Sequence, residues 1–171
     1  MATTYGLIAS TQVGAGGASS FDFQNIPSTY TDLILLISAR TNRAAYHESL
    51  LMTFNGSASN YYYQRMYLDS TTVYADYAST AMFAGQASGG TASANYFGSS
   101  RVEIFNYANT SFYKGSDSLG ISGNSSTSAL WAMTANRWAS TAAINRVTIT
   151  PENGGTIQQY SSAYLYGVKN S

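Results

Sequence analysis

The chain has 171 residues, balances eight Lys and Arg against eight Asp and Glu, and contains no cysteine. A formal net charge of zero gives no electrostatic attraction to a nucleic-acid backbone or an anionic membrane, and the absence of thiols excludes disulfides and thiolate chemistry. Charged residues make up only 9% of the sequence, against about 25% in an average soluble protein. With so few charges, free monomers would repel each other only weakly and would tend to associate. We therefore expect much of the surface to be buried in an oligomer or larger assembly.

The N-terminal sequence MATTYGLIAS has neither the basic region nor the long apolar run of a signal peptide. No stretch approaches the ~20 apolar residues of a membrane span. We therefore expect a protein made in the cytosol, which stays there or leaves it as part of a particle, with no membrane and no nucleic acid as partner. The length suits one domain, and no repeat or linker divides residues 1–171.

Short apolar or alternating runs recur along the chain between clusters of Gly, Asn and Ser, and no window keeps a helical period. This pattern predicts an all-β, single-domain antiparallel β-sandwich or barrel. The predicted strands, in chain order, are residues 3–9, 19–23, 33–37, 48–54, 71–77, 99–107, 111–121, 129–138, 144–150 and 164–168. In the strand at 99–107 we expect Val102 and Ile104 to face inward, and residues 123–128 (GNSSTS) predict a turn.

The run Leu33 to Ile37 consists of five consecutive aliphatic residues. Successive side chains of a strand point to opposite faces, so an apolar run of this kind predicts a strand that is covered on both faces. We interpret it as the central strand of the core, with Phe21 and Phe23 on the strand that leads into it through the turn at Pro27.

Three segments are harder to assign. Residues 60–69 (NYYYQRMYLD) fit a short helix or an edge strand, and residues 79–95 are small and Gly-rich, which predicts a long loop with a short strand at Met82 and Phe83. Asn153-Gly154-Gly155 predicts a hairpin from the strand that Pro151 closes to residues 156–159. Trp131 and Trp138 are seven residues apart, so in one regular strand they would face opposite sides.

No constellation of side chains matches a known catalytic or metal site. His47 is the only histidine, no Gly-X-Ser-X-Gly elbow is present, and common zinc sites need more His or Cys than the chain has. The eight carboxylates are spread out, and the glycines at 14–17 lack the strand and helix of a dinucleotide site. We therefore predict no enzyme activity, no catalytic residue, no metal site and no cofactor.

Tyrosine is the unusual feature of the composition, with 15 residues in several clusters. A tyrosine ring with its hydroxyl suits protein interfaces and sugar platforms, although tyrosine is also a good strand former. We predict partner contacts at Tyr61, Tyr62, Tyr63 and Tyr67, and further contacts from the loop at residues 85–95.

Two stretches carry a family resemblance. Residues 21–40 read F-D-F-x-N-I-P-x-T-Y-T-D-L-x-L-x-x-S-A-R, and residues 144–168 contain I-N-R-V-T-I-T-P-x-x-G-G followed by S-S-A-Y-L-Y-G-V. With Phe54-Asn55-Gly56 and residues 104–107 (IFNY), they resemble a family of small bacteriophage virion proteins. The resemblance implies a β-sandwich of jelly-roll type and a place in the virion, and it implies no catalytic residues.

Two functions remain open at this point. The first is a non-enzymatic capsid decoration (cement) protein, a homotrimer that stabilises the shell through contacts with the major capsid protein or other virion proteins. Its basis is a compact, neutral chain without a fibre-forming segment. The alternative is a tail-fibre or receptor-binding module that recognises host polysaccharide, and its basis is the tyrosine clusters.

Overall fold

A computed structural model describes residues 5–123 and 129–169 of the chain. These residues contain no helix, so no helix in the described ranges could cross a membrane. They form twelve β-strands, which are β1 (Tyr5–Gln12), β2 (Phe21–Phe23), β3 (Asp32–Ala39), β4 (His47–Phe54), β5 (Tyr61–Asp69), β6 (Thr72–Ala78), β7 (Met82–Ser88), β8 (Gly98–Phe105), β9 (Lys114–Gly123), β10 (Ala129–Trp138), β11 (Val147–Pro151) and β12 (Ser162–Val168).

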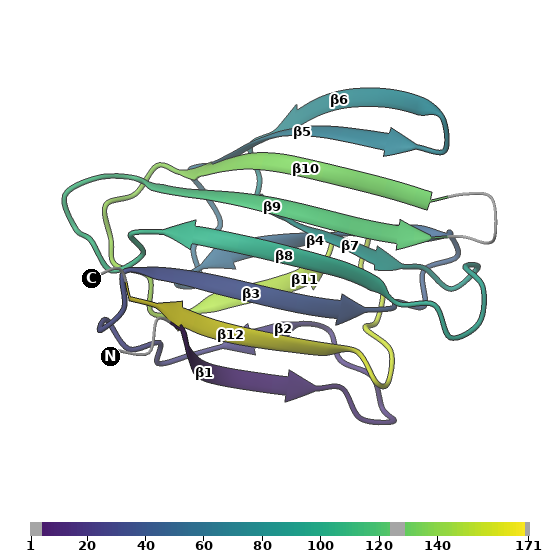
Figure 1. The fold of residues 1–171 in the computed structure, drawn as a ribbon, viewed down its shortest axis with the longest axis horizontal. Helices are drawn as coiled ribbons and strands as arrows, with labels where there is room; N and C mark the ends of the chain where they lie inside the picture. Colours follow the sequence, from purple (N-terminus) through teal and green to yellow (C-terminus); the bar gives the residue numbers. More distant parts are fainter. Residues whose placement is uncertain (1–4, 124–128, 170–171) are drawn as a thin grey trace.

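The strands make two antiparallel sheets that face each other (Figure 1). The large sheet has eight strands in the order β1-β12-β3-β8-β9-β10-β5-β6, and the small sheet has four in the order β2-β11-β4-β7. In Figure 1 the small sheet lies behind the large one. The predicted all-β antiparallel sandwich is confirmed, and the core fills the space between the sheets.

Strand β3 lies inside the large sheet, between β12 and β8. Leu33, Leu35 and Ile37 point into the core and are at most 3% exposed, as the sequence predicts. The prediction of cover on both faces is wrong at Leu36, which is 41% exposed on the outer side. On the outer side of β3 the prediction therefore holds at Ile34, which is 4% exposed, and fails at Leu36, which the described chain leaves open.

Strand β7 corrects the prediction of a long loop at residues 79–95. Every residue from Met82 to Ser88 is buried, because β7 pairs with β4 on one side and lies directly on the inner face of β8 and β9. Two glycines permit this approach. A Cβ at Gly120 would lie 2.7 Å from the backbone nitrogen of Gln86, and one at Gly85, whose φ is +132°, would lie 2.0 Å from Ser100 Oγ.

The second edge of β7 has no partner strand, and side chains of the large sheet take that place. Asn136 accepts a hydrogen bond from Phe83 N at 3.0 Å and donates one to Phe83 O at 3.2 Å. Ser118 Oγ also donates to Phe83 O, and Ser100 Oγ accepts from Gln86 N at 2.9 Å. Buried backbone groups at a sheet edge need such partners, so these side chains fix β7 against the large sheet.

The segment at residues 60–69 contains strand β5 (Tyr61–Asp69), which is neither a helix nor an edge strand. It pairs with β10 on one side and with β6 on the other, so β6 is the edge strand. Figure 1 shows the β5–β6 hairpin at one border of the large sheet. A second, smaller core of Tyr63, Phe83, Leu130 and Ala132 lies under this hairpin and joins it to β7.

Several further sequence predictions can be compared with the structure. The predicted hairpin at residues 153–155 is wrong, because residues 156–159 form no strand and Ile157 bridges to Ala18 and Thr41 instead of pairing with β11. The segment connects β11 of the small sheet to β12 of the large sheet. The predicted turn at residues 123–128 lies outside the described residues beyond Gly123. The inward positions of Val102 and Ile104 and the opposite faces of Trp131 and Trp138 are confirmed.

Replacing Gly120 tests the close contact of β7. Gly120→Ala would force the backbones of β9 and β7 apart, so we expect a loss of about 1–3 kcal/mol in the free energy of unfolding, measured by denaturant titration. Gly115→Ala on the same strand is the control, because its Cβ would meet nothing within 4 Å, and it should change stability by less than about 0.5 kcal/mol. Equal effects of the two substitutions would contradict the contact.

Candidate functional site

The outer face of the large sheet is the most apolar exposed surface of the described chain. Directly paired residues of antiparallel strands share a face, and one such row crosses six strands. The row runs Tyr164, Leu36, Arg101, Leu119, Met133 and Met66. All but one of its members are apolar or aromatic, which is unusual for a sheet face that the chain leaves open.

Twelve large apolar side chains on this face are 39–82% exposed, namely Tyr5, Leu7, Leu36, Tyr62, Met66, Val73, Tyr77, Phe105, Leu119, Ile121, Met133 and Tyr164. Two grooves run along it. One of about 860 Å³ follows β8 to β6, and one of about 520 Å³ follows β12 to β9. Arg101 and Leu119 border both grooves. We call this surface the outer face.

The few charges on the outer face are of both signs. Arg101 forms an ion pair with Glu103 at 2.8 Å, and Asp117 lies opposite Glu103 on the next strand. The guanidinium of Arg137 lies 4.6 Å from the ring centroid of Tyr62, so that cation rests on an aromatic face. The outer face therefore has no strong field of one sign that would select an anionic or a cationic partner.

A second candidate surface is a polar cleft of about 510 Å³, where the β5–β6 hairpin extends past the small sheet. We call it the polar cleft. In contrast to the apolar outer face, most side chains that line the polar cleft carry hydrogen-bonding groups. The lining residues are Arg43, His47, Ser49, Arg65, Tyr67, Asp69, Tyr74, Gln86, Leu130, Glu152 and Asn153.

Arg65 organises the wall of the polar cleft. Its guanidinium forms a bidentate ion pair with Asp76 on β6 and donates to Ser49 Oγ on β4 at 3.1 Å. The same group lies 4.9 Å from the ring centroid of Phe83 and 4.8 Å from that of Tyr67. These contacts fix the arginine on two sides, so it holds the hairpin at a set distance from the small sheet.

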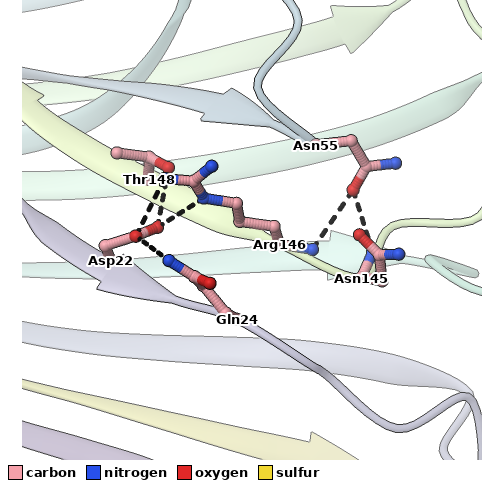
Figure 2. Close-up of polar contacts among 6 residues, drawn as sticks. All are labelled: Asp22, Gln24, Asn55, Asn145, Arg146 and Thr148. Carbon is pink, nitrogen blue, oxygen red and sulfur yellow. Dashed lines mark hydrogen bonds and ion pairs between the residues drawn. The ribbon is translucent and has the colours of Figure 1, made fainter.

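A third cluster of polar groups lies on the small sheet and has a structural role (Figure 2). The Asp22 carboxylate accepts hydrogen bonds from Gln24, from Thr148 and, at 2.8 and 2.9 Å, from Arg146. Asn55 Oδ1 accepts from the backbone nitrogens at 145 and 146. These bonds connect β2, β11 and the turn after β4, and they occupy the groups that would otherwise meet a ligand.

The four tyrosines that the sequence predicts as partner contacts differ in how far they are buried. Tyr61 is fully buried, stacks on Trp138 and hydrogen-bonds to the backbone of Phe54, and Tyr63 is 6% exposed in the smaller core. Both therefore lie out of reach of a partner in this conformation. Tyr62 is half exposed on the outer face, and Tyr67 lines the polar cleft, so contacts there stay predictions.

The predicted contact loop at residues 85–95 is also placed differently. Its first four residues belong to the buried strand β7. The remainder is tied to the body by Arg40, whose guanidinium donates to the carbonyls of Gly90, Ala92, Ser93 and Tyr96 at 2.9–3.3 Å. The exposed apolar residues of the outer face were not predicted as contacts, although outward residues such as Leu119 and Met133 alternate with inward ones in the sequence and could have indicated this face.

No arrangement for catalysis stands out in the described residues. Within residues 5–123 and 129–169, no group of three or more His, Cys, Asp or Glu residues lies close enough to hold a metal ion. His47 lines the polar cleft with its ring against Tyr46, and burial lowers the pKa of His47 below its usual value. A neutral imidazole at pH 7 follows, and Nδ1 of this ring makes no hydrogen bond to the described chain.

Comparisons with known proteins leave the family open. No protein-family model matches the chain, and no curated protein sequence matches it. A double mutant of congerin II has a TM-score of 0.31 and 10% identity over 85% of this chain and 98% of its own. A scytalido-glutamic peptidase with a transition-state analogue inhibitor has a TM-score of 0.22 and 6% identity over 88% of this chain and 64% of its own. Both likenesses are too weak to carry an argument.

The Asp22 cluster predicts a dependence of stability on acid. The hydrogen bonds from Arg146 are the main cause that lowers the pKa of Asp22 from 3.8 to about 2. The stabilisation is therefore complete above pH 3.8 and lost as pH falls through about 2. Asp22→Asn should lower the free energy of unfolding by no more than about 1 kcal/mol near neutral pH, because solvent screens the pair. The difference from the unaltered protein should vanish in acid, and a difference independent of pH would contradict the assignment.

Proposed function

We propose that this protein is a non-enzymatic bacteriophage virion structural protein, a capsid decoration protein that assembles with further copies of itself through the outer face. The observation that carries the proposal is the broad apolar surface of the large sheet, which the described chain leaves uncovered. The resemblance of residues 21–40 and 144–168 to small virion proteins supports the virion part of the proposal.

The size of the outer face supports a stable contact. Twelve side chains about half exposed, each of roughly 150–250 Å² when aromatic, present on the order of 1,000 Å² of apolar surface, comparable with the ~800 Å² per partner of a standard interface. Monomeric proteins rarely expose a connected apolar patch larger than about 300–600 Å². Burial of this surface against another copy would also reduce the exposed apolar area of a chain whose 9% charged residues give little repulsion between copies.

The charges on the outer face favour a second copy over a highly charged partner. Arg101, Arg137, Glu103 and Asp117 bring two charges of each sign to the same surface, so copies of the chain can present opposite charges to each other. The two grooves differ in size and lining, and a cyclic trimer joins two different patches of each copy. The oligomer that we propose is therefore a homotrimer.

Met133→Arg tests the role of the outer face in assembly. Met133 lies at its centre, opposite Leu119 and Met66, and a buried, unpaired guanidinium would be costly there. We expect the unaltered protein to have the mass of a trimer by light scattering and the variant to dissociate about a hundredfold more readily. Thr150→Arg, on an exposed position of β11 in the small sheet, is the control and should stay trimeric.

Two results would overturn the assembly proposal. One is a monomer at all concentrations for the unaltered protein. The other is a Met133→Arg variant that keeps the β signature in circular dichroism and the mass of the trimer. If Met133→Arg loses the β signature, Leu119→Lys takes its place in the test. Leu119 is 41% exposed, so this substitution leaves the core unchanged.

The place in the virion has its own test. We expect antibodies against the protein to label the capsid shell of purified particles, and particles that lack the protein to release their contents at a lower temperature. Labelling of the tail alone would contradict the decoration role and favour the tail-fibre alternative. If purified natural virions do not contain the protein, both virion roles are wrong and only the self-assembly proposal remains.

A further inference from the structure

The polar cleft is separate from the outer face and has a different construction. Strands of both sheets contribute, with His47 and Ser49 from β4, Tyr67 and Tyr74 from β5 and β6, and Gln86 from β7. It opens because β5 and β6 extend beyond the small sheet, whose last strand is β7. A volume of about 510 Å³ lies within the range of about 300–1,000 Å³ that small-molecule sites have.

The charges of the polar cleft nearly cancel. Arg43 and Arg65 contribute two positive charges, and the carboxylates of Asp69 and Glu152 contribute two negative charges. Arg65 is already held by the bidentate pair with Asp76, so it is not available as a free anion site. That leaves Arg43 against the carboxylates of Asp69 and Glu152, so a phosphate or carboxylate ligand would meet more repulsion than attraction, and a ligand without negative charge is favoured.

The lining supplies donors and acceptors together. Asn153, Gln86 and Ser49 can each donate and accept, and the carboxylates accept. Gln86 is 1% exposed, lines the cleft, and its Oε1 accepts no hydrogen bond from the described chain. Nδ1 of His47 is likewise buried and makes no hydrogen bond to the described chain. Buried polar atoms of this kind are satisfied by a partner in nearly all proteins, so the cleft holds hydrogen-bonding capacity suited to a hydroxylated ligand.

The aromatic wall of the cleft ends in an accessible ring. Phe83, the Arg65 guanidinium, Tyr67 and Tyr74 form a continuous stack, in which the two tyrosine rings are 5.0 Å apart with planes at 17°. Tyr67 is covered on both sides by this stack, whereas Tyr74 remains 46% exposed. An aromatic ring held in place in this way offers one free face to the apolar side of a sugar ring.

We propose that the polar cleft binds a neutral saccharide, whose ring stacks on Tyr74 and whose hydroxyl groups bond to Gln86, His47 and the cleft carboxylates. Hydroxyl groups both donate and accept, so they match the mixed set of partners, and a ligand without negative charge avoids repulsion from the cleft carboxylates. Arg65 is the one lining residue that the cleft shares with the grooves of the outer face, so an assembled protein should still present the cleft. It gives the protein a glycan-binding function in addition to assembly.

The test uses the full chain with neutral disaccharides of different linkage, namely lactose, maltose, cellobiose and N,N′-diacetylchitobiose. Two-dimensional NMR of the ¹⁵N-labelled protein reports the Gln86 side-chain amide and the Arg65 Nε–H directly. We expect at least one sugar to shift these signals in a saturable way at millimolar concentration or below. Inorganic phosphate is the anionic comparison and should leave them unchanged.

Variants locate the binding. Tyr74→Ala removes the exposed ring and should weaken binding about fivefold or more, and Gln86→Met should also weaken it, because a side chain of similar size then lacks the amide donors and acceptor. Tyr113→Ala is the matched control, because Tyr113 is equally a surface tyrosine, 56% exposed in the connection before β9, outside the cleft lining. It should bind the sugar unchanged.

Three outcomes would overturn the proposal. They are no saturable shift with any of the four sugars, a response to phosphate alone, and equal binding by the unaltered protein and Tyr74→Ala. Light scattering on the same samples separates this proposal from the assembly proposal, because Tyr74→Ala should keep the trimer and Met133→Arg should keep the sugar signals. If Gln86→Met fails to fold, the Tyr74→Ala and Tyr113→Ala pair decides the question.

Discussion

The arrangement of the whole molecule depends on the contact between β7 and the inner face of the large sheet. Gly120 and Gly85 let two backbones approach at a distance that a Cβ would prevent. Asn136, Ser118 and Ser100 then supply hydrogen bonds where a neighbouring strand would otherwise stand. This contact closes the sandwich at the middle of the large sheet, over β8, β9 and β10, so the two sheets cannot end at the same border.

The offset between the sheets creates the two candidate surfaces. Because the small sheet ends at β7, the β5–β6 hairpin extends beyond it, and Arg65 joins the hairpin to β4 and encloses a polar cleft. The opposite side of the large sheet has no layer of its own and presents apolar rows. One face therefore suits burial against another protein, and the cleft suits a small hydroxylated ligand, since their lining groups have opposite hydrogen-bonding capacity.

Local alternation predicted most strands well, because side-chain period depends only on backbone geometry. Val102 with Ile104 and the two tryptophans of β10 were assigned correctly to their faces. Strand β7 was predicted only at Met82 and Phe83, because the rest of its sequence, MFAGQAS, is small and Gly-rich. Those small residues allow a close approach that is visible only when β9 is placed beside β7. Of the candidate surfaces, local patterns could indicate Tyr62, Tyr67, outward apolar residues such as Leu119 and Met133, and the position of His47 at the start of a strand.

By itself, the sequence determined the class of fold, the alternation of core positions and the lack of charge, all of which follow from composition and from neighbours along the chain. Only the tertiary structure decided which apolar positions are covered. Leu35 and Leu36 are equivalent in the sequence, yet the first is fully buried and the second is 41% exposed. The tertiary structure also brought Arg65, Gln86 and Tyr74 into one cleft from three strands. The physical reason is that burial and cleft chemistry depend on which sheets face each other, and that depends on contacts between residues far apart in the chain.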